Sequence, residues 1–137
     1  MNFLLDTNAC IALINRTSEH ARARFDRALA SKHQIFVSSI TTFELWYGVF
    51  RSSRIRFNSD RLEAFLRAPV TIVPFDEEDS RSAGIIEAEL RMRGRRIGNY
   101  DMLLAGQALE KHFTFVTSDI SDFCHVKGLN CQDWARA

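Results

Sequence analysis

Four acids lie at positions where this chain can build a reactive site. Two follow short apolar or β-branched runs and two lie within apolar segments of helical spacing: Asp6, Asp119, Glu44 and Asp101. Because the carboxyl ends of parallel strands meet at one edge of an α/β sheet, acids from distant parts of the chain are expected to converge there. Converging carboxylates repel one another unless a cation lies between them. The pattern therefore predicts a divalent-metal site.

Each of these acids also has an ordinary structural explanation. Asp6 can cap a helix or form an Asx turn within Asp6-Thr7-Asn8, and Asp101 in a first helical turn is favoured by the helix dipole. The segment Thr117–Asp122 can be a plain turn. These explanations suffice singly. They do not explain why three acids fall at strand ends or at the helix start that follows, and the fourth on the polar edge of an apolar helix.

The segment Thr42–Arg51 is expected to be a strongly apolar helix. At about 100° per residue, one face carries aromatic residues and is extended by two aliphatic ones: Phe43, Trp46, Tyr47, Phe50, Leu45 and Val49. Glu44, Gly48 and Arg51 share the remaining strip. Such a helix is expected to be buried or covered by a partner. Its aromatic residues favour a core or a subunit interface over a base-stacking platform, and Gly48 indicates either substrate access or close helix packing.

The elements that must position these acids alternate between strands and helices. Short apolar or β-branched runs predict strands at Asn2–Leu5, Ile35–Ser38, Val70–Pro74, Thr114–Thr117 and, weakly, Leu129–Gln132. Ser18 and Asp76 are expected to cap helices, and Arg51–Ser59 is expected to be an irregular connector. Strands separated by helices predict right-handed βαβ units, and therefore an α/β fold with a parallel sheet covered on both faces.

Length and composition favour one domain over residues 1–137, of 46% hydrophobic and 26% charged residues. No segment has the length and apolarity of a membrane span, and the N-terminus does not have the pattern of a secretory signal. Three cysteines without a CxxC pair indicate reduced thiols and a cytoplasmic location. A zinc site is disfavoured because the candidate ligands lack paired spacing: Cys124, His125, Cys131 and His112.

The net charge is only +1, which excludes a general nucleic-acid coating protein. Arginines nevertheless gather in two stretches, Arg51–Arg61 and Arg91–Arg96, after Glu44 and before Asp101 respectively. Any single arginine can be a solvated surface residue, whereas the two groups suit a polyanionic substrate. The candidates for substrate contact are Arg51, Arg95 and Arg96.

Four segments stand in a specific order and spacing: Leu5–Asn8, Ser39–Leu45, Ile97–Ala105 and Val116–Asp119 with Asp122-Phe123. Together they resemble the PIN-domain ribonucleases, and within them the VapC-type toxins of toxin-antitoxin pairs. The resemblance extends from Phe3 to about Trp134 and implies a PIN-like three-layer α/β/α fold with a short central parallel sheet. It implies metal binding and catalysis by four acids: Asp6, Glu44, Asp101 and Asp119. Supporting roles fall to Thr7, Asn8 and Thr117, and Asp122 is the alternative fourth acid.

The resemblance also implies an activity and a partner. Carboxylate oxygens select Mg²⁺ or Mn²⁺, and the implied reaction is hydrolysis of RNA that leaves a 5′-phosphate. The implied partner is a VapB-like antitoxin that crosses the active site with its tail and contacts operator DNA, in a homodimer, heterotetramer or hetero-octamer. The expected antitoxin surface is formed by Trp46, Tyr47 and Phe50.

Two other classes of function fit parts of this pattern. A toxin-antitoxin regulatory module would use its acids mainly to dock the antitoxin tail. A phosphatase or receiver domain is disfavoured, because neither Lys111 nor Lys127 has a suitable context.

Overall fold

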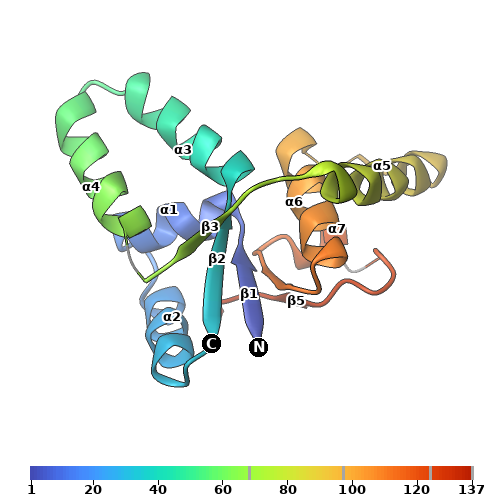
Figure 1. Cartoon of the computed structure of the whole chain (residues 1–137), viewed down its shortest axis with the longest axis horizontal. Coiled ribbons are helices and arrows are strands. Elements are labelled where there is room, and N and C mark those ends of the chain that lie inside the picture. Colours follow the sequence, from blue (N-terminus) through green and yellow to red (C-terminus); the bar gives the residue numbers. More distant parts are fainter. Residues whose placement is uncertain (68, 97, 124, 137) are drawn as a thin grey trace.

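The computed structural model describes residues 1–67, 69–96, 98–123 and 125–136. Its strands are β1 (Asn2–Leu5), β2 (Gln34–Ser38), β3 (Thr71–Val73), β4 (Thr114–Val116) and β5 (Cys131–Gln132). Its helices are α1 (Thr7–Asn15), α2 (Glu19–Ala30), α3 (Ser39–Phe50), α4 (Ile55–Arg67), α5 (Glu77–Met92), α6 (Asn99–Glu110) and α7 (Ile120–Phe123). Figure 1 shows how they are arranged. No helix in the described ranges combines the length and the apolarity needed to cross a bilayer.

The strands form one parallel sheet in the order β3-β2-β1-β4-β5. The chain first builds outward from the central strand β1 to β2 and β3, and then crosses to the other side of β1 to add β4 and β5. The order therefore reverses between β1 and β4. In an open α/β sheet, ligands bind beyond the carboxyl ends of the strands at such a reversal.

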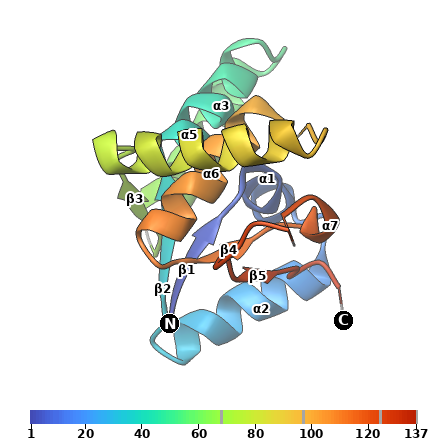
Figure 2. The same ribbon diagram turned by 90° about the vertical axis from the view of Figure 1, so that its right-hand side faces the viewer.

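Helices cover both faces of the sheet, as Figures 1 and 2 show. Phe3 and Leu5 pack with residues of α1 to α4, whereas Leu4 packs with residues of α5 and α6. This division follows from the alternation of side chains along a strand. The predicted three-layer α/β/α fold with a short parallel sheet is confirmed.

The two predicted helix caps are present. Ser18 Oγ accepts a hydrogen bond from Ala21 N at 3.1 Å and caps α2. Asp76 Oδ1 accepts from Asp79 N, and Asp79 Oδ2 accepts from Asp76 N, both at 3.0 Å. This reciprocal pair is a capping box, which satisfies backbone N–H groups that the start of α5 would otherwise leave unpaired.

The connector between α3 and α4 is shorter than expected, because α4 begins at Ile55. The backbone N–H of Asn58 donates to Arg54 O at 2.9 Å, so the helical bonding pattern starts within the stretch Arg51–Ser59 that was expected to be irregular. Between α3 and α4, only residues 51–54 lie outside the helices. The strands β3, β4 and β5 are also shorter by one or two residues than the sequence pattern predicts.

The aromatic face of α3 is largely exposed within this chain, so of the two expected locations for Tyr47 and Phe50, the core or an interface with a partner, only the interface stays open. Thr41, Leu45 and Val49 turn toward the core instead, while Tyr47 is 61% exposed and Phe50 is 62% exposed. Phe43 is also exposed, whereas Trp46 is partly buried and packs against the core. Helix α3 therefore presents aromatic surface to its surroundings.

Helix α6 is clamped against α5. A Cβ atom at Gly106 would lie 2.5 Å from Ala83 Cα, so only glycine permits this approach. Lys111 donates to Asp79 Oδ1 at 2.9 Å, and Gln107 Nε2 donates to Asp79 Oδ2 at 3.0 Å. Asp79 is fully buried, and these bonds compensate its charge. This clamp fixes the position of the amino end of α6, which carries Asp101.

Candidate metal centre

Asp6 lies where β1 passes into α1, at the reversal of the sheet order. Its side chain is 2% exposed and accepts a hydrogen bond from Ala9 N at 2.7 Å, which caps α1. Burial raises the pKa of Asp6 to about 6, although the hydrogen bonds from Ala9 and Thr117 oppose the shift. The charges of Asp101 and Asp119 raise this pKa further. Asp6 therefore lies in a negative field.

Asp101 reaches the same region from the first turn of α6. Its carboxyl is half-buried, and its pKa is raised to about 6. Burial is the largest cause, and the charges of three neighbouring acids raise the pKa further: Asp119, Glu44 and Asp122. A Cβ atom at Gly98 would lie 3.4 Å from Asp101 Oδ2, so glycine leaves space beside this carboxylate. The fold thus brings Asp101 within electrostatic range of the acids from α3 and from the end of β4.

Glu44 extends from α3 and is held by a hydroxyl of α1. Thr7 Oγ1 donates to Glu44 Oε1 at 2.5 Å and lies 3.2 Å from Thr41 Oγ1. The sequence interpretation assigned a supporting role to Thr7 but missed Thr41, which stands one turn before Glu44 and is fully buried. It also missed Cys10, whose thiol pKa is raised by burial and then by the nearby acids.

The segment after β4 supplies two further acids and a hydroxyl. Thr117 Oγ1 accepts from Asp119 N at 3.1 Å and also hydrogen-bonds to the Asp6 carboxylate. The charge of Asp119 raises the pKa of both Asp6 and Asp101, whereas that of Asp122 raises the pKa of Asp101 alone. Asp119 thus interacts with more of the cluster. Asn8 is exposed on the first turn of α1.

The chemistry of this donor set fits a hard divalent cation. Within the described ranges, no basic side chain forms an ion pair with these acids. In the same ranges, no three His, Cys, Asp or Glu side chains are arranged tightly enough to hold one ion. The carboxylates are therefore gathered but not closed around a common point. Carboxylate and hydroxyl oxygens suit Mg²⁺ or Mn²⁺ better than zinc.

The candidate arginines lie away from these contacts. Arg51 follows α3 and its guanidinium lies 5.5 Å from the centre of the Tyr47 ring, while Arg95 and Arg96 are exposed between α5 and α6. Among the described residues, none of these three arginines forms an ion pair with an acid. Cys124, one of the disfavoured zinc ligands, lies outside the described residues.

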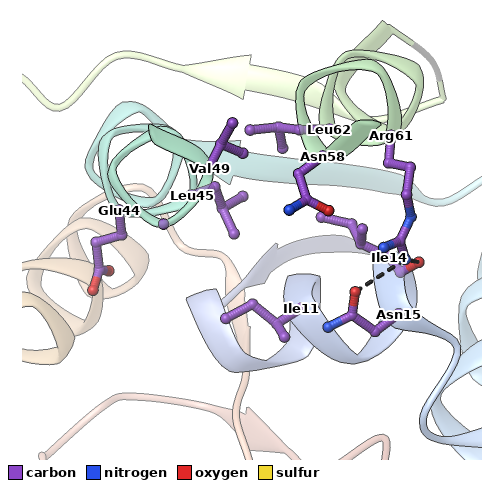
Figure 3. A pocket seen from close by; sticks show the side chains of 10 residues that line it. Ile11, Ile14, Asn15, Glu44, Leu45, Val49, Asn58, Arg61 and Leu62 are labelled. Carbon is purple, nitrogen blue, oxygen red and sulfur yellow. Dashed lines mark hydrogen bonds between the residues drawn. The ribbon is translucent and has the colours of Figure 1, made fainter. Parts of the chain in front are cut away.

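A hollow of about 250 Å³ lies beside Glu44, between α1, α3 and α4. Figure 3 shows Glu44 at one end and Arg61 with Asn15 at the other. Arg61 Nη2 donates to Ile14 O at 2.6 Å and to Asn15 Oδ1 at 3.0 Å, which ties α4 to the end of α1. The walls between these ends are mainly aliphatic: Ile11, Ile14, Leu45, Val49 and Leu62.

Comparison with known proteins identifies the family. The PIN domain model matches residues 3–129. The chain is 33% identical to the tRNA(fMet)-specific endonuclease VapC of Salmonella typhimurium over 98% of both chains. It is also 33% identical to ribonuclease VapC2 of Rickettsia felis, again over 98% of both.

Solved structures agree in fold. VapBC2 from Rickettsia felis, bound to a DNA fragment from its promoter, aligns with a TM-score of 0.90 and 31% identity, over 98% of this chain and 99% of that chain. DNA-bound VapBC from Salmonella typhimurium aligns with a TM-score of 0.88 and 33% identity over 98% of both chains. The sequence resemblance is confirmed: this chain belongs to the PIN-domain family and, within it, to the VapC ribonucleases.

Proposed function

We propose that this chain is the toxin of a toxin-antitoxin pair, an endoribonuclease that depends on Mg²⁺ or Mn²⁺. The observation that carries the proposal is the gathering of uncompensated carboxylates at the reversal of the sheet order, in a chain similar to VapC ribonucleases over nearly its full length. We propose that it acts as one PIN domain in the cytoplasm, where its RNA substrate is found.

Four acids are proposed to hold the metal: Asp6, Glu44, Asp101 and Asp119. Thr7 orients Glu44 through its hydrogen bond, and Thr117 links Asp6 to the backbone of Asp119. Asp122 lies within range of Asp101 and adds to the negative field. Asn8, at the exposed start of α1, is proposed to contact the substrate side of the site.

The reaction we propose is in-line hydrolysis of a phosphodiester, leaving a 5′-phosphate and a 3′-hydroxyl. When bound, the cation would activate a water molecule and stabilise the charge that develops on the phosphate oxygens. The chain's own contribution is a rigid set of carboxylates, fixed by the cap on α1, by Thr7 and by the clamp between α5 and α6. No histidine is required for this chemistry. The expected substrate is a single-stranded RNA loop, as in tRNA or rRNA.

The proposed inhibitor is a VapB-like antitoxin, which would bind operator DNA on behalf of the complex. The exposed rings of Tyr47 and Phe50 and the hollow beside Glu44 offer apolar surface for its tail. A basic residue of the tail would be attracted to the uncompensated acids.

Because Trp46 packs against the core, Tyr47→Asp is a cleaner test of this surface than a change at Trp46. We expect Tyr47→Asp to weaken complex formation, and unchanged affinity would contradict this assignment.

The proposed activity is tested by incubating antitoxin-free protein with total cellular RNA in Mg²⁺, Mn²⁺ or EDTA and mapping the new 5′ ends. We expect cuts that require metal, carry 5′-phosphates and disappear in Asp101→Asn.

The relatives that were solved on DNA favour a second candidate, a regulatory module whose acids mainly dock the antitoxin. Absence of metal-dependent cleavage by properly folded, antitoxin-free protein would favour that second candidate.

A further inference from the structure

One strip of α3 leads away from the acids without obstruction. Glu44, Gly48 and Arg51 are spaced by four and three residues and therefore share one side of the helix. A Cβ atom at Gly48 would meet nothing within 4 Å, and Gly48 also lines the hollow beside Glu44. At a rise of about 1.5 Å per residue, Arg51 lies roughly 10 Å along the axis from Glu44. We call this side of α3 the Glu44–Arg51 strip.

The strip ends in a cluster of arginines stacked on exposed rings. The Arg51 guanidinium lies 5.5 Å from the centre of the Tyr47 ring, and that of Arg54 lies 4.0 Å from the centre of the Phe57 ring. Arg61 approaches the same Phe57 ring at 5.4 Å. Phe57 is 46% exposed, so its ring is not part of the core. These contacts hold the guanidinium groups in place on the connector between α3 and α4 and on the first turns of α4.

The cluster carries an excess of positive charge, although Arg61 also donates to Ile14 O and Asn15 Oδ1. Residues 51–61 contain four arginines and one acid, Asp60. Among the described residues, none of these arginines forms an ion pair with an acid. In Figure 1 the connector between α3 and α4 lies at the end of the helix pair that is farthest from the sheet. A bound polyanion could thus extend from this end along α3 to the acids.

We propose that the Glu44–Arg51 strip and the cluster around Phe57 bind a single-stranded segment of the RNA substrate next to the cleaved bond. This inference rests on the proposed ribonuclease activity and assigns it a substrate path. Arginines on a groove attract the phosphates, and exposed aromatic rings stack on unpaired bases of any sequence. Gly48 keeps the path open between the two ends. A duplex would not offer its bases to Phe57, so the path selects unpaired RNA.

Binding is tested without cleavage, in protein that carries Asp101→Asn, by fluorescence anisotropy with a labelled single-stranded oligouridylate. In this background Phe57→Leu is expected to weaken binding about tenfold, or about 1.4 kcal/mol, as for the loss of one base stacked on an aromatic ring. Arg54→Gln is expected to weaken binding and to reduce the slope of log affinity against log salt by about 0.7, the value for one phosphate contact on a single strand. Gly48→Leu is expected to block the path while the protein stays folded, because the added side chain enters open space.

Two matched controls separate this path from general effects. Arg22 also stacks on a ring, that of Phe25 at 5.6 Å, but lies on α2 and pairs with Asp26. Gly84 is a helical glycine of α5 that likewise has nothing within 4 Å. Arg22→Gln and Gly84→Leu are therefore expected to leave RNA affinity and its salt dependence unchanged.

Two results would overturn the inference. Equal losses in Arg54→Gln and Arg22→Gln would mean that RNA binds by general charge alone. Unchanged RNA affinity in Phe57→Leu, Arg54→Gln and Gly48→Leu would mean that this surface serves a different macromolecule, such as an acidic protein segment. Both results concern binding and stand apart from the activity itself. If the unmodified protein cleaves RNA and these variants bind it normally, only the substrate path is wrong.

Discussion

Replacing Asp6 by asparagine is expected to stabilise the metal-free protein at neutral pH. Burial is the largest cause that raises the pKa of Asp6 from 3.8 to about 6 in the folded state. Each pKa unit corresponds to about 1.36 kcal/mol, so the buried charge costs at most about 3 kcal/mol at pH 7. Asparagine caps a helix as well as aspartate does, so the hydrogen bond from Ala9 can be kept. We expect a gain of roughly 1–3 kcal/mol, or about 3–10 °C in Tm.

The gain should depend on pH in a defined direction. Because the pKa of Asp6 is higher in the folded state than in the unfolded state, the folded protein holds this proton as the pH rises. The stability that the proton contributes is complete below the unfolded value of 3.8 and is lost as the pH rises through about 6. The difference between Asp6→Asn and the unmodified protein should therefore be small near pH 4 and largest above about pH 7.

Urea denaturation in EDTA across this pH range measures the effect, with Asp26→Asn as a control. Asp26 is an exposed acid of α2, so its loss should change stability by at most about 0.5 kcal/mol. Adding Mg²⁺ should then stabilise the unmodified protein and leave Asp6→Asn nearly unchanged, since a cation that binds only the folded state raises its stability. The reasoning is refuted if Asp6→Asn is less stable at pH 7, or if its effect does not vary with pH.

Three further changes test the supports of the site. Gly106→Ala should destabilise the fold by about 1–3 kcal/mol in urea titrations, because α5 leaves no space for a Cβ atom there. The control Gly84→Ala should stabilise the fold by up to about 1 kcal/mol. Equal effects of the two changes would contradict the close contact between α5 and α6. Lys111→Met should cost about 3 kcal/mol by leaving the buried Asp79 carboxylate without its cation, and an unchanged urea midpoint would contradict this. Thr7→Val should weaken Mn²⁺ binding and cleavage about tenfold, the effect of losing one hydrogen bond to a charged group, and full activity would contradict its orienting role.

Much of the fold was predictable because its signals are local. Short apolar runs indicated β1 and β2, and capping residues such as Ser18 and Asp76 marked the helix starts. The expected region of the acids followed from the rule that strand ends meet at one edge of a parallel sheet. These inferences need only neighbouring residues and general topology.

What sequence could not predict depends on packing. Helix α3 has two apolar sides, and spacing alone does not decide whether Tyr47 or Leu45 turns toward the core. In the folded chain Leu45 is buried in the core and Tyr47 is exposed. The hydrogen bond between Thr7 and Glu44 joins residues 37 positions apart, so no local pattern indicates it. The contact of Gly106 with α5 is equally a product of helix packing.

The central claim is that these acids form a site for a divalent cation, and calorimetric titration of Mn²⁺ or Mg²⁺ into metal-free protein tests it most directly. We expect saturable binding that releases protons near pH 6, because burial and neighbouring charges raise the pKa of Asp6 and of Asp101 to about 6. Asp101→Asn should lose this binding while remaining folded. Absence of binding at millimolar metal, or equal binding by Asp101→Asn, would contradict the account.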